Sequence, residues 1–328
     1  MSIPRFLRIK IFSLISCIAI FLTVANILVG YLFLSRSLEE ERIIIINHNS
    51  SIRKITNQLA DESVIKYKLL FKVIATIYNM RYPLKSGEYR FTSDINPYQV
   101  LLKISSGKSI VRKLYIPEGS TTKEIIDKVN ETKRLVGQIN YSIPEGHLMP
   151  STYFYSYGDR KETLIEIMLD LMSSNLDKAV RLLPPDSPIK TRKDILTLAS
   201  IIEKEAGNEE EKPIIASVFI NRLKKGMRLQ ADPTVIYSIT KGQYKLARRL
   251  RKKDLQISSA YNTYRIYGLP PGPISSPSYS SIMSVVKPTK SNYLYFVVNG
   301  KGGHNFATSL EKHNKNVAIF RASRKARR

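Results

Sequence analysis

The longest apolar run of the chain lies close to its N-terminus. Residues 11–34 contain no charged side chain, and a helix of that length, at about 1.5 Å per residue, is roughly 36 Å long, which is enough to cross a bilayer. A cleavable signal would have an apolar core of roughly 7–15 residues followed by small residues, whereas the charged segment SRSLEEER follows here. The pattern therefore predicts an uncleaved transmembrane helix.

The charges around this run predict its orientation. Arg5, Arg8 and Lys10 precede it, and basic residues favour the cytoplasmic side of a membrane. We expect residues 1–10 to remain in the cytoplasm. The chain after residue 34 is expected to lie outside, because long domains cross a membrane largely regardless of their own charge.

Short β-branched runs alternate with amphipathic stretches over residues 42–138. Their periodicities predict an α+β arrangement, with strands near 43–46, 88–91 and 113–116 and helices near 52–59, 68–78, 97–104 and 122–129. The strand–turn–helix order of the first part returns about 70 residues later. This return fits either two small modules, 42–108 and 109–138, or coincidence in a common pattern.

Turn residues and tyrosines become frequent from residue 139, which indicates a domain boundary or a loop that lines a groove. Beyond it, apolar positions recur at helical spacing near 161–176, 192–206, 214–223 and 234–239. An Asn299-Gly300 pair between apolar runs predicts a hairpin. We expect a larger α+β domain over residues 139–320, followed by a basic tail at 321–328.

Composition limits the possible partners. Lysine and arginine number 52 against 27 acidic residues, a net charge of +25, which indicates nucleic acid, a membrane surface or an anionic polymer as partner. Because export is predicted, we expect no nucleic acid. The only cysteine, Cys17, lies inside the apolar run, and the four histidines have no metal-binding spacing. We therefore expect no disulfide, no metal and no cofactor.

Two glutamates lie near the end of the predicted helix 192–206. At 100° per residue, Leu198 and Ile201 flank Glu205, and Glu203 has apolar neighbours of its own. Apolar surroundings raise the pKa of a carboxyl group, and a protonated carboxyl is what a general acid needs to cleave a glycosidic bond. Each glutamate could instead pair with a lysine at the helix end. Periodicity does not choose between Glu203 and Glu205.

Other acidic residues stand where helices are expected to begin. Residues 209–211 are all glutamate and precede Pro213, and Asp232 precedes Pro233. Acids favour helix N-termini and proline suits the first turn. We therefore predict that Asp232 is an N-cap rather than a second catalytic carboxylate.

The C-terminal half contains a series of long motifs. They read IIEKE, ASVFINRL, GMRLQADPTVIY, AYNTY, GLPPGPI and GGHNF, in that order, between residues 200 and 316. In content and order they resemble the YceG-like family of endolytic murein transglycosylases. The N-terminal apolar run and the Gly-Glu-Tyr strand before Asn96 are similar to the family's single N-terminal helix and LysM-like module.

The resemblance implies a bacterial enzyme on the periplasmic side of the cytoplasmic membrane that cleaves nascent peptidoglycan glycan strands internally, without water. Such cleavage leaves 1,6-anhydro-N-acetylmuramic acid ends and would terminate strand elongation, beside penicillin-binding peptidoglycan synthases. The family's catalytic glutamate corresponds to Glu205, as general acid and then base. The candidates for substrate binding are Gln230, Thr234, Tyr261, Asn262 and Tyr264, for which turn and cap structure is an equal explanation. His304 is a further candidate, although a lone histidine in a glycine-rich turn is more often structural.

Two other functions stay open at this point. One is a non-catalytic, membrane-anchored peptidoglycan-binding protein. The other is a muramidase-type hydrolase on the same scaffold, which would need a second carboxylate, with Asp232 as the candidate. The segment 244–254 is more basic than the family's pattern. It is expected to be a solvated loop or to bind anionic lipid headgroups or a lipid-linked pyrophosphate.

Overall fold

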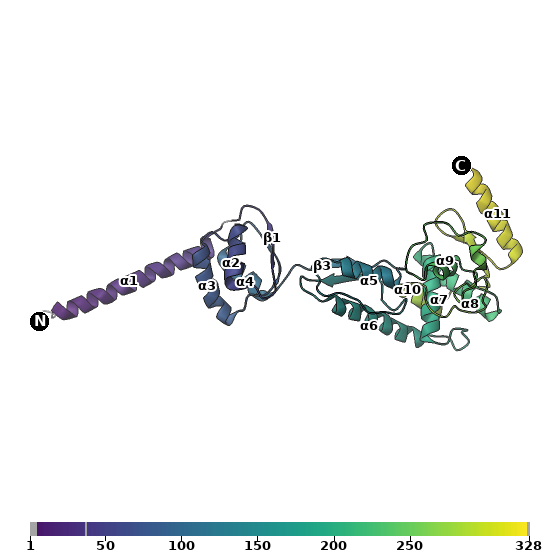
Figure 1. The fold of residues 1–328 in the computed structure, drawn as a ribbon, viewed down its shortest axis with the longest axis horizontal. Coiled ribbons are helices and arrows are strands. Elements are labelled where there is room, and N and C mark those ends of the chain that lie inside the picture. The colour runs from purple at the N-terminus through teal and green to yellow at the C-terminus, as the bar shows by residue number, and fades with distance from the viewer. Residues whose placement is uncertain (1–4, 37, 327–328) are drawn as a thin grey trace. The chain divides into compact units, whose positions relative to one another are not determined.

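The computed structural model describes residues 5–36 and 38–326, and the chain forms two compact units (Figure 1). The first unit comprises the residues up to Arg112 together with Phe154–Asp159, and the second comprises Lys113–Tyr153 and the chain from Arg160 onward. Helices and two-stranded sheets occur in the chain, so the predicted α+β class is confirmed. The boundary predicted between residues 138 and 139 falls inside the second unit.

The first unit combines one strand pair with several helices. Strands β1 and β2 are antiparallel, with Ile44 opposite Tyr89, and their inward side chains join those of the helices in one apolar core. The hydroxyl of Ser51 accepts a hydrogen bond from the amide of Lys54, which is the predicted N-cap. The elements of this unit are α1 (Arg5–Leu34), β1 (Arg42–Ile46), α2 (Ile52–Asp61), α3 (Lys68–Arg81), β2 (Gly87–Phe91) and α4 (Pro97–Ser106).

Helix α1 contains the apolar run predicted to span a membrane. Its segment Arg8–Leu34 is, among the described residues, the one helix long and apolar enough for a span. Most of its large apolar side chains are exposed, but Tyr31 near its C-terminal end is buried in the core of the unit. The described part of α1 begins at Arg5, so the helix includes the basic residues that precede residue 11, which are good helix formers.

The second unit is built around helix α7 (Figure 1), which contacts α6, α8, α9 and α10. The strand pair β3 and β4 includes two of the three points where the chain passes from one unit to the other. The elements of this part are β3 (Arg112–Tyr115), α5 (Thr122–Glu131), β4 (Thr152–Tyr155), α6 (Lys161–Val180), α7 (Arg192–Glu205), η1 (Glu209–Glu211), α8 (Lys212–Lys224), α9 (Asp232–Thr240), η2 (Asp254–Gln256), α10 (Tyr279–Val286), β5 (Tyr295–Val298), β6 (His304–Ala307) and α11 (Leu310–Ala326).

Helix α7 is central because its middle segment is buried on every side. All residues from 195 to 202 are buried, and burying a Leu or Ile side chain contributes about 1.5–3 kcal/mol. The helix starts with the predicted capping box, in which Thr191 and Asp194 bond to each other's backbone amides. It ends after Glu205, where Ala206 adopts an extended conformation. This stop leaves Glu205 as the last helical residue.

The end of the chain forms a hairpin covered by a helix. Strands β5 and β6 are antiparallel around the predicted Asn299-Gly300 turn, and Phe320 of α11 lies against Gly300. The predicted basic tail continues α11 as far as residue 326, and residues 327–328 lie outside the described residues. The basic segment 244–254 is largely exposed.

Candidate active site

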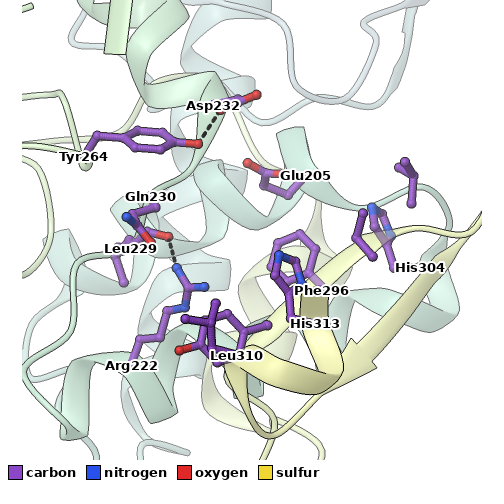
Figure 2. Close-up of a pocket in the computed structure, with 13 residues that line it drawn as sticks. Glu205, Arg222, Leu229, Gln230, Asp232, Tyr264, Phe296, His304, Leu310 and His313 are labelled. Carbon is purple, nitrogen blue, oxygen red and sulfur yellow. Dashed lines mark hydrogen bonds between the residues drawn. The ribbon is translucent and has the colours of Figure 1, made fainter. Parts of the chain in front are cut away.

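A pocket of about 370 Å³ lies at the C-terminal end of α7 (Figure 2). This volume lies within the range of ligand-binding pockets, about 300–1,000 Å³. The pocket is lined by side chains from α7, α8, α9, the hairpin, α11 and the intervening loops: Glu205, Arg222, Leu229, Gln230, Asp232, Tyr264, Tyr295, Phe296, Val297, Val298, His304, Leu310 and His313. Segments more than a hundred residues apart in the sequence thus meet around Glu205.

Glu205 lines this pocket from the end of its helix (Figure 2). Burial raises the pKa of the Glu205 carboxyl to about 8, and the charge of Asp232 acts in the same direction. A hydrogen bond from the Asp232 backbone and the charge of Arg222 lower the pKa, but by less. Glu205 is therefore protonated at neutral pH, which is the state of a group that donates a proton.

Asp232 lies beside Glu205 and is not the helix cap that the sequence predicts. The N-cap of α9 is Ala231, and Asp232 is the first helical residue. Its carboxylate instead accepts a hydrogen bond of 2.6 Å from the hydroxyl of Tyr264. Burial and the Asp232 carboxylate raise the pKa of Tyr264, so this hydroxyl stays protonated. The local cap pattern failed because a tyrosine from another segment binds the carboxylate.

Arg222 supports the opposite wall of the pocket. Its guanidinium donates to the carbonyl oxygens of Leu294 at 2.6 Å and Leu229 at 2.7 Å, and it lies 5.2 Å from the ring centre of Tyr295. These contacts connect α8 to β5 and to the segment before α9. Sequence reasoning did not select this arginine, although it stands in the ASVFINRL motif.

Glu203 has a different environment from Glu205. It accepts hydrogen bonds from the amide of Ser278 at 2.8 Å and from Lys212. Lys212 is only 3% exposed, and it also bonds to Glu209, Ser278 and Ser280. The Glu203–Lys212 ion pair, 3.2 Å long, therefore joins α7, α8 and the start of α10. Glu203 is occupied in this network and does not line the pocket.

Glu211 bonds to His304, which also lines the pocket. The His304 Nδ1 and Glu211 Oε2 atoms are 2.7 Å apart, and the His304 amide donates to Glu211 Oε1 at 2.6 Å. The sequence predicts only a helix-starting role for this glutamate. The 93 residues between the two partners explain why no local pattern indicates the contact.

The predicted substrate-binding residues divide into three groups, the third of which is Tyr261 alone. Gln230, Tyr264 and His304 line the pocket with Glu205. Thr234 and Asn262 are completely buried and do not line it. Their polar atoms form hydrogen bonds with other groups of the protein.

Thr234 donates to the Ala231 carbonyl, and Asn262 donates to the carbonyls of Leu255 and Ile257. The Gln230 amide in turn donates to the carbonyl of Thr263. The AYNTY motif thus supports the loop that carries Gln230.

Tyr261 lies in a second pocket, of about 620 Å³, which Glu145 and Arg192 also line. Its ring packs on Tyr237 with centroids 4.9 Å apart. Sequence reasoning missed eight residues of the first pocket, namely Arg222, Leu229, Tyr295, Phe296, Val297, Val298, Leu310 and His313. Within residues 5–36 and 38–326, no group of three or more His, Cys, Asp or Glu side chains could hold a metal ion.

Comparison with known proteins agrees with the motifs. The endolytic murein transglycosylase of Bacillus subtilis is 31% identical over 307 residues, covering 82% of each chain. That of Streptococcus pneumoniae D39 is 29% identical, covering 83% of this chain and 57% of the relative. A crystal structure of a yceG-like protein from Listeria monocytogenes has 34% identity and a TM-score of 0.52, covering 86% of this chain and 99% of that one. The YceG-like family profile matches residues 44–319, so this chain belongs to the YceG-like family.

Proposed function

We propose that this chain is a membrane-anchored lytic transglycosylase that cleaves peptidoglycan glycan strands internally. Its family and its relatives, which are named endolytic murein transglycosylases, support this activity. The observation that carries the proposal is the Glu205 carboxyl group, whose pKa burial raises to about 8, in a pocket of about 370 Å³. Glycosidic bonds are cleaved by such an acid.

In the proposed reaction, Glu205 acts twice. Its proton passes to the glycosidic oxygen as the bond from that oxygen to C1 of the muramoyl sugar breaks. The 6-hydroxyl oxygen of the same sugar then bonds to C1, and its proton returns to the Glu205 carboxylate. The products are a 1,6-anhydro-N-acetylmuramic acid end and a free hydroxyl on the departing strand. A raised pKa suits both steps, because it keeps the acid protonated and makes its conjugate base stronger.

The remaining parts of the chain have proposed roles that follow from this activity. Helix α1 would anchor the protein in the cytoplasmic membrane with residues 1–10 inside, and the second unit would act in the periplasm. The first unit would hold glycan in the manner of a LysM-like module. Cleavage close to the membrane would end the elongation of strands made by neighbouring penicillin-binding synthases.

A muramidase-type hydrolase is the second candidate, because Asp232 supplies a second carboxylate in the same pocket. Mass spectrometry of purified glycan strands digested by the full chain separates the two. Anhydro-muramoyl ends support the transglycosylase, and reducing muramoyl ends support the hydrolase. Glu205→Gln should abolish either product. If neither product forms with the wild-type chain, only the binding function is left.

A further inference from the structure

His304 and Glu211 form a hydrogen-bonded pair whose geometry is suited to holding a sugar in one orientation. Glu211 lies at the end of η1, and His304 is the first residue of β6. One carboxylate binds both the ring and the backbone of the same histidine, at 2.7 and 2.6 Å. Two bonds to one residue fix the position and the rotation of the imidazole.

Glycines make this close approach possible. A Cβ atom at Gly303 would lie 2.6 Å from Glu211 Oε1, and one at Gly207 would lie 3.0 Å from the Gly302 carbonyl oxygen. A side chain at Gly303 would therefore displace the Glu211 carboxylate, and one at Gly207 would press on the Gly302 backbone. The Gly302–Gly303 turn therefore rests against the segment that directly follows Glu205. The position of His304 therefore depends on the position of the segment that carries Glu205.

The bonding partner also selects the tautomer of the ring. A carboxylate only accepts hydrogen bonds, so Nδ1 of His304 carries the proton that it donates to Glu211, and in a neutral ring Nε2 has a free lone pair. Within the part of the chain that the structure describes, Nε2 has no hydrogen-bond partner. The ring of Phe296 packs edge to face against the imidazole, with centroids 5.3 Å apart. His304 lines the pocket that contains Glu205 (Figure 2).

We propose that His304 and Glu211 form a positioning pair, in which His304 Nε2 accepts a hydrogen bond from a hydroxyl group of the sugar seated over Glu205. This inference rests on the proposed function, because it takes a glycan strand as the ligand. Glu211 has no contact with the sugar in this arrangement. It acts by holding the ring and by keeping the proton on Nδ1.

Binding to intact glycan strands tests the pair apart from cleavage. The full chain in detergent carries Glu205→Gln, so that strands are not cut, and is combined with His304→Asn or His304→Gln. Asparagine can keep a bond to Glu211 but does not extend to the Nε2 position, whereas the glutamine amide oxygen reaches that region. We expect Asn to weaken binding about tenfold, which is about 1.4 kcal/mol, and Gln to stay within about threefold of the parent.

Gln138→Asn is the control, since Gln138 is an exposed polar residue of the second unit that lines neither of the two pockets described above. It should leave the affinity unchanged. Unfolding temperatures of all variants show whether the fold is intact. If His304→Asn folds as the parent does and binds strands equally tightly, the pair only supports the fold and the inference is wrong.

The tautomer gives an independent readout. Nitrogen-15 NMR of histidine-labelled protein should show His304 protonated on Nδ1. In Glu211→Gln the side-chain oxygen can keep the His304 amide bond, which turns the new NH₂ group toward Nδ1 and moves the ring proton to Nε2. We expect this inversion together with weaker binding. An unchanged tautomer with unchanged affinity would overturn the proposal, whereas reducing ends in the wild-type digest would contradict the transglycosylase alone.

Discussion

Replacing Glu205 by glutamine should change how the stability of the protein depends on pH. The native carboxyl keeps its proton up to a pKa of about 8, compared with an ordinary value of 4.5. Between these values the unfolded chain has released the proton and the native chain has not. The unfolded state then binds fewer protons, so the free energy of unfolding falls as pH rises.

The magnitude follows from the size of the shift. The difference is 8 − 4.5 = 3.5 pKa units, and each unit corresponds to about 1.4 kcal/mol. The wild-type chain should therefore lose up to about 5 kcal/mol between pH 4.5 and 8, of which about 3 kcal/mol is lost by pH 7. Glutamine does not ionise. The Glu205→Gln protein should equal the wild type near pH 4.5 and be more stable above it.

Urea unfolding of the full chain in detergent, followed by circular dichroism across this pH range, measures the difference. Glu210→Gln is the matched control, because Glu210 is an exposed glutamate only five positions away. It should follow the wild-type pH dependence. If the Glu205→Gln and wild-type curves stay parallel from pH 4.5 to 8, the carboxyl is not protonated in the native pocket and the reasoning about the general acid fails.

Three further predictions concern activity, the buried ion pair and the anchor. Glycan strand cleavage should decline as pH rises through about 8, because Glu205 loses the proton that it donates; a pH profile of kcat checks this. Lys212→Met should destabilise the chain by about 3–5 kcal/mol, since it leaves Glu203 buried without its partner, and adding Glu203→Gln should recover part of the loss in urea unfolding. Deleting residues 1–36 should move the protein from the membrane fraction to the soluble fraction, whereas a chain that still sediments with membranes would mean that α1 is not the main anchor.

Local sequence was sufficient for most elements of the fold. The apolar run of α1, the Ser51 cap and the capping box of α7 all depend on residues within a few positions of one another. Such short-range interactions are visible in the sequence because their partners are set by the helical repeat. The hairpin turn at Asn299-Gly300 also depends only on residues that are close in the sequence.

From the sequence, residues of the site could be predicted only where they stand in one of the family motifs. Glu205 was selected through the family resemblance, and its apolar flanks did not distinguish it from Glu203. Asp232 was interpreted as a cap, and for Thr234 and Asn262 substrate contact and cap structure were equal explanations. The sequence does not show whether a polar side chain in a motif faces a ligand or a carbonyl group. The structure distinguishes these possibilities because it shows which group each polar side chain bonds to.

The sequence by itself determined the apolar N-terminal helix, most of the helices and strands that follow it, and the family. Only the tertiary structure decided that Glu203 pairs with Lys212 and Ser278 while Glu205 lines a pocket, and that Glu211 holds His304. These partners lie up to 93 residues apart. Burial and charge act through space, so the chemistry of a carboxyl group is set by segments that fold against it rather than by its neighbours in the chain.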